Sequence, residues 1–488
     1  MQSKDSYRTL VILLVLALLC AWTVMAELTN ARAFNGYCND DAYIAFTYAK
    51  NFNNEKGLVF HAGERVEGYT NFLWLIFLAP WMKWLPTVDV STIAIFWGAC
   101  FSVAVLILTY LLGYQERKHH WTNLVAPLLL SLDNTFHYWS VSGLENAMQT
   151  ALVLLAFLFL FGNRKRSALF SGIAFAIATM TRPDSGVFWA VAIAALLLRA
   201  LRPGGTGFSL KDLLQLSGGF LLILVPYGAW KIYYYGDLLP NTFYLHTGDR
   251  GVRIAKGSAY LFRFLENRFY LPLLGALALL AGYSFRRAVL LLSVLGFCFY
   301  TVWIGGDFFP GSRFYYVILP LIYLLMQDAA AWIAQSGGLK TAVSSAAACL
   351  LAGALIFTGS YGPRGEYQDF VLTWARDDLQ RIQLAKDFSR VAKEGDSILS
   401  GPVGQIAYYS GMKVLDYWGV TDPHIARSTA ATISENVPGH ERTDLEYLLN
   451  QKPVYIIFGV DPKHPPAGYA LHEFHVDNRR WVVLKRIE

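Results

Sequence analysis

Two adjacent carboxylates, Asp40 and Asp41, follow the first hydrophobic segment of the chain in the stretch Asn-Asp-Asp-Ala-Tyr-Ile. Acidic side chains beside apolar segments are costly to keep and commonly mark a functional site. Adjacent carboxylates suit a general base together with a partner that orients it or holds a metal ion. The alternative is a pair of solvated loop residues. We interpret the pair as catalytic and favour Asp40 over Asp41 as the base.

Further polar side chains recur at intervals between apolar runs, and they are candidates for binding a substrate. Arg313 is our preferred ligand for a phosphate, because the guanidinium fork matches phosphate oxygens. Lys231 and His246 are further phosphate candidates. The complete set of substrate-binding candidates is Glu67, Tyr69, Asn71, Glu145, Arg182, Asn241, His246, Asp307 and Arg313.

Several of these residues also have purely structural interpretations. Ser142 and Glu145 have the spacing of a helix capping box. Arg182 could anchor a helix end at the membrane interface. Arg313 could pair with Asp307 and only fasten its loop. The sequence leaves these structural interpretations open beside the binding roles.

Composition places the chain among membrane proteins. Of its 488 residues, 55% are hydrophobic and only 16% are charged, whereas soluble domains carry about 25% charged residues. The net charge of +6 comes without a basic stripe interleaved with aromatics, which argues against nucleic-acid binding. The five cysteines have no metal-site spacing, and no phosphate-binding Walker loop is present.

Apolar runs recur up to about residue 357, and their lengths predict roughly eleven membrane spans. The runs begin near Leu10, Thr92, Leu124, Leu144, Ala168, Val187, Leu213, Phe269, Ala288, Tyr315 and Val343. Basic residues then fall in every inner loop if the N-terminus is cytoplasmic, in keeping with the positive-inside rule. This topology requires that the segment 70–86 does not cross the membrane, and that it instead lies in the interface or re-enters. It also gathers all the unusual polar motifs on the outer side.

The sequence predicts two domains. Residues 1–360 would form the membrane domain, with a large first outer loop at 27–90. Residues 361–488 would form an extracytoplasmic α/β domain, with strands at 413–416 and within 453–458, a helix at 444–450, and a two-stranded hairpin over 471–487.

Five motifs together resemble the GT-C superfamily of membrane glycosyltransferases, and above all the terminal arabinofuranosyltransferases that use polyprenyl-phosphate arabinose. The motifs are Asn-Asp-Asp-Ala-Tyr-Ile (39–44), Gly-Glu-Arg-Val-Glu-Gly-Tyr-Thr-Asn-Phe-Leu-Trp (63–74), Tyr-Gly-Asp-Leu-Leu-Pro-Asn-Thr-Phe-Tyr (235–244), Gly-Gly-Asp-Phe-Phe-Pro-Gly-Ser-Arg-Phe (305–314) and Asp-Tyr-Trp-Gly-Val-Thr-Asp-Pro (416–423). His246 stands near the place where such enzymes carry a lysine.

The resemblance implies a GT-C-like, polytopic α-helical protein of the bacterial inner membrane. It implies transfer of a sugar, favouring arabinofuranose or a similar pentose, from a polyprenyl-phosphate donor to a glycan, lipid or protein acceptor of the cell envelope. The acidic reaction centre maps onto Asp40 or Asp41. Such a reaction requires no cofactor, and a divalent cation stays open. The alternatives are a polar-lipid transporter or flippase, and a non-catalytic envelope assembly protein.

Overall fold

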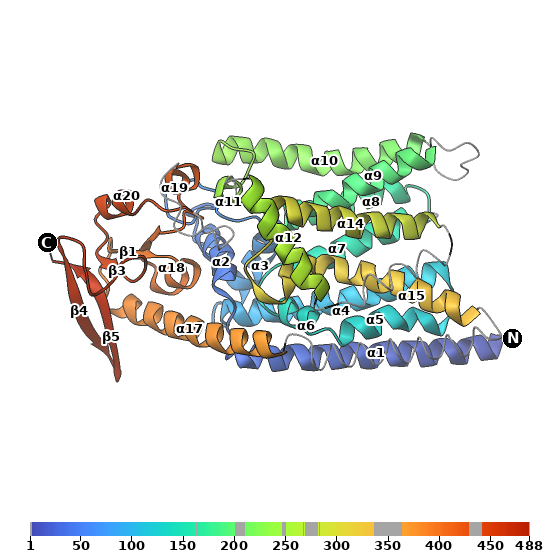
Figure 1. The fold of residues 1–488 in the computed structure, drawn as a ribbon, viewed down its shortest axis with the longest axis horizontal. Helices are drawn as coiled ribbons and strands as arrows, with labels where there is room; N and C mark the ends of the chain where they lie inside the picture. Colours follow the sequence, from blue (N-terminus) through green and yellow to red (C-terminus); the bar gives the residue numbers. More distant parts are fainter. Residues whose placement is uncertain are drawn as a thin grey trace. The chain divides into compact units, whose positions relative to one another are not determined.

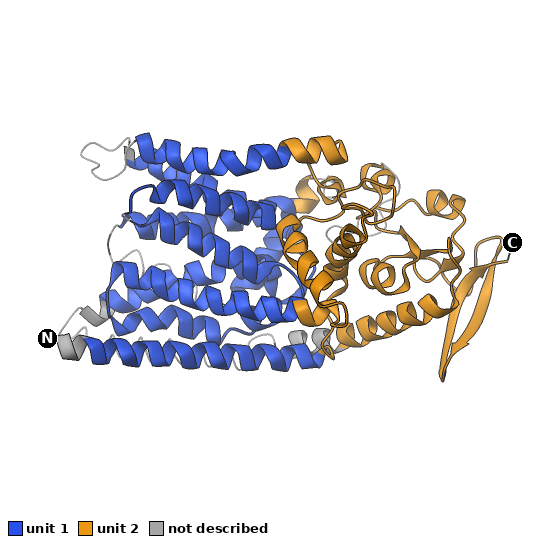
Figure 2. Cartoon of the chain, turned by 180° about the vertical axis from the view of Figure 1, so that it is seen from behind, with its two compact units in different colours: residues 1–33, 94–228, 254–370 blue, residues 34–93, 229–253, 371–488 orange. Residues whose placement is uncertain are grey.

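A computed structural model describes residues 2–162, 164–200, 210–245, 250–266, 268, 282, 284–335, 364–428 and 442–487 (Figure 1). By Cα packing the chain divides into two compact units. Unit 1 contains residues 1–33, 94–228 and 254–370, and unit 2 contains residues 34–93, 229–253 and 371–488 (Figure 2). Each unit is thus assembled from three separate stretches of the chain.

Unit 1 is helical in its described part. Most or all of each of the following elements belongs to it: α1 (Gln2–Ala33), α4 (Val90–Glu116), η1 (Trp121–Leu124), α5 (Val125–Ser131), α6 (Asn134–Ser140), α7 (Asn146–Leu160), α8 (Ser167–Thr181), η2 (Pro183–Ser185), α9 (Gly186–Ala200), α10 (Leu210–Tyr235), α12 (Arg250–Glu266), α14 (Phe285–Ile304), η3 (Pro310–Ile318) and α15 (Leu319–Gln335). Among the residues that the structure describes, five helical segments are long and apolar enough to cross a membrane: 6–33, 90–116, 210–235, 285–304 and 310–332. The chain is therefore a polytopic α-helical membrane protein.

The apolar run that begins near Leu124 is not one continuous helix, which corrects the expected span. It is divided into η1, α5 and α6, and the break falls at Asp133, whose carboxylate accepts a hydrogen bond from the backbone N–H of Phe136 and so caps α6. The same carboxylate pairs with Arg268 at 3.1 Å. A buried acidic side chain with these partners fixes a helix start where the hydropathy predicted a helix interior.

The other expected spans have mixed outcomes. α3 (Phe72–Trp84) is a 13-residue helix, too short to cross, in keeping with the expectation that segment 70–86 does not span. α7 and α8 are apolar but have only 15 residues each. The runs that begin near Phe269 and Val343 lie outside the described residues.

Unit 2 combines a small sheet with short helices. Its other elements are α2 (Asp40–Asn53), α3, α11 (Asn241–Leu245), α17 (Arg364–Val391), α18 (Gly404–Ser410), α19 (Pro423–Arg427), α20 (Leu445–Asn450), and strands β1 (Ser397–Ser400), β2 (Lys413–Asp416), β3 (Tyr455–Ile456), β4 (Tyr469–Val476) and β5 (Arg479–Arg486). The strand order is β2-β1-β3-β5-β4. β1 pairs in parallel with β2 and β3, and β5 pairs antiparallel with β3 and β4. The predicted strand at 413–416 and the predicted hairpin are confirmed.

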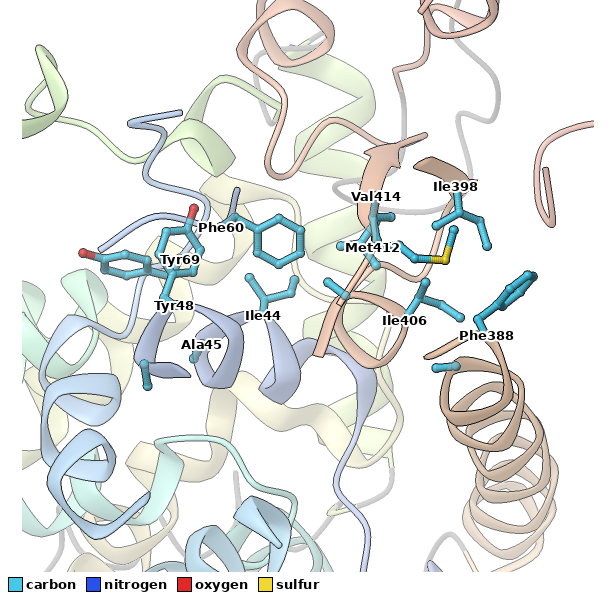
Figure 3. Close-up of a cluster of buried hydrophobic side chains, with 14 of the residues drawn as sticks. Ile44, Ala45, Tyr48, Phe60, Tyr69, Phe388, Ile398, Ile406, Met412 and Val414 are labelled. Carbon is cyan, nitrogen blue, oxygen red and sulfur yellow. The ribbon is translucent and has the colours of Figure 1, made fainter. Parts of the chain in front are cut away.

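One hydrophobic core joins the segment after the first helix to the C-terminal segment. Figure 3 shows Tyr48 and Tyr69 of the first segment in the same cluster as Phe388, Ile406 and Val414 of the second. The domain boundary expected at residue 360 stays a prediction. In the observed packing, residues 371–488 form a unit together with residues 34–93 and 229–253.

Candidate functional site

Asp40 and Asp41 form the first turn of α2, directly after Asn39 at its N-cap position. Carboxylates are favoured there because the first backbone N–H groups of a helix carry partial positive charge. Both aspartates are half-buried. The sequence placed this pair in a loop, whereas the structure places it on a helix whose next eight residues after the pair are all buried.

Asp40 is also held by the C-terminal segment. Its Oδ1 accepts a hydrogen bond from the backbone N–H of Gln405 at 2.9 Å, and its Oδ2 accepts one from Gly404 at 3.1 Å. A Cβ on Gly404 would lie 2.1 Å from the carbonyl oxygen of Asp40, so only glycine permits this close approach of α18 to α2. Two residues that sequence reasoning did not select therefore fix the orientation of the favoured base.

Glu67 and Lys231 form a buried ion pair in unit 2. The Lys231 Nζ lies 2.8 Å from the Glu67 Oε2, and both residues are at most 6% exposed. Burial raises the pKa of Glu67 to about 7, although the Lys231 charge opposes this shift. Lys231 was a candidate for a phosphate contact, and here its observed partner is a carboxylate.

Asn241 binds the loop that follows β2. Its Nδ2 donates to the carbonyl oxygens of Gly419 and Val420 at 2.8 and 3.0 Å, and its backbone N–H donates to the carbonyl oxygen of Glu67. Asp416 organises the same loop from inside by accepting hydrogen bonds from the N–H groups of three loop residues, Trp418, Gly419 and Thr421. Three of the five motifs behind the GT-C resemblance, at 63–74, 235–244 and 416–423, thus meet in unit 2.

In unit 1, Arg182 lies at the centre of a second polar cluster. Its Nη1 lies 2.9 Å from Glu145, and its Nε and Nη2 both bind Asp184. Gln149 donates to Asp184 at 2.6 Å. The proposed capping box is wrong, because Glu145 itself occupies the N-cap position of α7 and its side chain makes no capping hydrogen bond. Glu145 is instead a partner of Arg182.

Arg313 and Asp307 form an ion pair, which is the structural alternative that the sequence left open. Arg313 Nε lies 2.8 Å from one carboxylate oxygen of Asp307, and Nη2 lies 3.1 Å from the other. The guanidinium groups of Arg182 and Arg313 also both lie over the ring of Phe314, at 5.1 and 5.3 Å from its centroid. Three polar loops expected to share one face of the membrane therefore converge around Phe314.

Asp328 of α15 joins the segment that follows α4 to the first turn of α14, and the predicted topology places both of these basic segments in the cytoplasm. Arg117 and Arg286 each lie 2.7 Å from one of its carboxylate oxygens. Two of the basic segments that the predicted topology places on one side thus meet in unit 1, and their orientation in the membrane stays a prediction.

The remaining candidates have different surroundings. Tyr69 is buried in the core of Figure 3, and its hydroxyl lies 3.0 Å from that of Tyr235. Asn71 is buried at the N-cap position of α3. His246 lies outside the described residues. No group of three His, Cys, Asp or Glu side chains suited to a metal ion occurs in the part of the chain that the structure describes, and the divalent cation stays a prediction.

Comparison with solved structures gives the class of fold. ArnT from Cupriavidus metallidurans, bound to undecaprenyl phosphate, matches over 96% of this chain and 97% of its own, with a TM-score of 0.58 and 11% identity. The archaeal oligosaccharyltransferase AglB from Archaeoglobus fulgidus, in complex with an inhibitory peptide and a dolichol-phosphate, matches over 90% of this chain and 69% of its own, with a TM-score of 0.54 and 13% identity. The chain therefore has the GT-C fold.

Matches by sequence cover less of the chain than matches by fold. A family model described as a domain of unknown function, DUF8728, matches residues 372–485, a range that contains β1 to β4 and all but the last residue of β5. A search of curated proteins found no match.

Proposed function

We propose that the protein is a membrane glycosyltransferase that moves a sugar from a polyprenyl-phosphate donor to an acceptor hydroxyl of a cell-envelope glycan, lipid or protein. The observation that carries the proposal is the likeness of fold, over nearly the full length of both chains, to ArnT bound to undecaprenyl phosphate. The bound dolichol-phosphate of AglB adds support, because both lipids are polyprenyl phosphates. The resemblance of the five motifs favours arabinofuranose or a similar pentose as the sugar.

The proposed chemistry assigns one task to each group. The acceptor oxygen forms a bond to the anomeric carbon of the sugar, the polyprenyl phosphate leaves, and the acceptor proton passes to Asp40 or Asp41. The backbone N–H groups of Gly404 and Gln405 hold the carboxylate of Asp40 in one orientation, which is the positioning that general-base catalysis needs. Arg313 binds the phosphate, with Asp307 keeping the guanidinium in place until the donor enters.

The test is sugar transfer by the purified protein in lipid nanodiscs. The donors are radiolabelled polyprenyl-phosphate arabinofuranose and its hexose counterparts, and the acceptor is an extract of envelope glycans and lipids. Removing a general base lowers rates by about 10²–10⁴-fold, so Asp40→Asn or Asp41→Asn should lose this much transfer while the protein stays folded. Wild-type rates in both variants would refute the assignment. Movement of the lipid across the bilayer without sugar transfer would instead favour the flippase.

A further inference from the structure

The C-terminal segment contains a second candidate binding site, a cavity of about 300 Å³ within unit 2. Most of its polar lining comes from α17, which contributes Asp377, Gln380 and Arg381. Its aromatic lining comes from Phe458 and Trp481. The volume is at the lower end of the range of small-molecule sites, which is about 300–1,000 Å³.

The position of this cavity follows from the sheet. Ser400 and Pro402, which line it, stand at and just after the carboxyl end of β1, and Phe458 stands just after the end of β3. β1 and β3 are parallel neighbours. In open α/β sheets, ligands bind in the crevice outside the carboxyl ends of parallel strands. The cavity lies at that edge.

The walls of the cavity are held in place by contacts made behind them. The Trp481 indole N–H donates to Asp387 at 2.7 Å. The Phe458 ring packs edge-on against Trp418 at 5.0 Å, and a Cβ on Gly401 would lie only 2.6 Å from it. A site whose side chains are already fixed loses little conformational entropy when it binds a ligand.

The lining also defines the chemistry of the ligand. Arg381 is paired with Asp378 at 2.6 Å, and Asp377 adds a further negative charge, so the cavity offers no excess of positive charge for an anion. Within the described residues, both partners of Arg381 bond to its Nη1, which leaves Nε and Nη2 as donors for a ligand. Amide, guanidinium and carboxylate groups beside aromatic rings suit a neutral polyhydroxyl ligand with apolar C–H faces.

A short hydrogen-bonded chain connects the cavity with the proposed base. Arg381 donates to the side-chain Oε1 of Gln405 at 3.0 Å, and the backbone N–H of Gln405 donates to Asp40. We propose that this cavity is a subsite for a neutral sugar unit of the acceptor glycan, and that it presents the neighbouring hydroxyl to Asp40 and Asp41. The acceptor role rests on the proposed transferase function, whereas sugar binding does not.

The test measures binding and transfer separately on the full-length protein in nanodiscs. Binding of neutral arabino-, galacto-, gluco- and manno-oligosaccharides of three to five units is measured by saturation-transfer NMR, with an oligouronate and inorganic phosphate as acidic probes. Gln380→Ala and Arg381→Lys each remove hydrogen bonds to the ligand and should weaken binding of a neutral oligosaccharide by about 3–10-fold. Arg376→Ala is the matched control, because Arg376 is exposed on the same helix outside the cavity lining.

The outcomes separate this inference from the proposed function. Asp40→Asn should lower transfer by about 10²–10⁴-fold and leave oligosaccharide binding intact. Transfer with an acceptor KM that is unchanged in Gln380→Ala would overturn the subsite and leave the transferase standing. Neutral oligosaccharide binding without any transfer would support the subsite and overturn the transferase. No binding of any neutral probe, equal binding by all variants, or a preference for the acidic probes would overturn the subsite.

Discussion

The Glu67–Lys231 pair provides the sharpest test of the energetics in unit 2. The two charges lie 2.8 Å apart, and both side chains are at most 8% exposed. At an effective dielectric constant of about 20, Coulomb's law gives an attraction of about 6 kcal/mol, which desolvation of both ions partly cancels. Glu67→Gln removes one charge and leaves the ammonium group buried. We expect it to lower the free energy of unfolding, but by less than the about 3–5 kcal/mol typical of a broken buried pair, because a pKa of about 7 leaves Glu67 only partly ionised in the wild type at pH 7.

Lys231→Met should cost less than Glu67→Gln. Burial already raises the pKa of Glu67 to about 7, and loss of the Lys231 charge removes the main influence that opposes this shift. Glu67 can therefore take up a proton near neutral pH in Lys231→Met and avoid a buried unpaired charge. The double variant should recover much of the stability lost in Glu67→Gln, because both charges are gone.

The assay is a guanidinium titration of the purified protein in detergent at pH 7, followed by tryptophan fluorescence, for the wild type, both single variants and the double variant. Coupling between the two sites is the difference between the double variant and the sum of the singles. Additive effects, or a Glu67→Gln protein within about 0.5 kcal/mol of the wild type, would show that the pair does not stabilise unit 2 as reasoned here.

Three further predictions concern the donor, pH and topology. Arg313→Lys should weaken binding of polyprenyl phosphate, because lysine keeps the charge but loses the fork, and Arg313→Ala should weaken it further. Unchanged affinity in both variants would leave the ion pair with Asp307 as the role of Arg313. Burial raises the pKa of Asp378 from 3.8 to about 7, so its contribution to stability should be present below about pH 4 and lost by about pH 7. This corresponds to at most about 4 kcal/mol, and Asp378→Asn should flatten the pH profile of unfolding; an unchanged slope would contradict the shift. Reporters fused within the loop 164–166 should report a cytoplasmic location, and alkaline phosphatase activity there would reverse the predicted orientation.

The sequence by itself determined the local elements. Lys413–Asp416 is the observed β2, and β4 and β5 form the hairpin predicted over 471–487, with its turn at Asp477 and Asn478. Helix 445–450 begins after Asp444, whose side chain caps it. Such features depend on residues a few positions apart, through alternation, capping and turn chemistry, so the pattern of one short segment suffices to predict them.

The sequence also predicted which loops of unit 1 share a side of the membrane. The charge bias of membrane proteins acts on whole loops, so this prediction does not require the contacts between loops to be known. The sequence identified Glu145, Arg182, Asp307 and Arg313 as unusual. It left undecided whether they bind a ligand or one another, since a charged side chain in a loop has the same local signature in both cases.

Only the tertiary structure decided the long-range partners. Asp40 is bound by the backbone of Gly404 and Gln405, more than 360 positions away, and backbone N–H groups carry no residue-specific signal. Lys231 meets Glu67 across more than 160 positions. These contacts exist because residues 34–93 and 371–488 bury one common hydrophobic core. The choice of partner segment is a property of complementary packing surfaces, which the pattern of either segment alone does not contain.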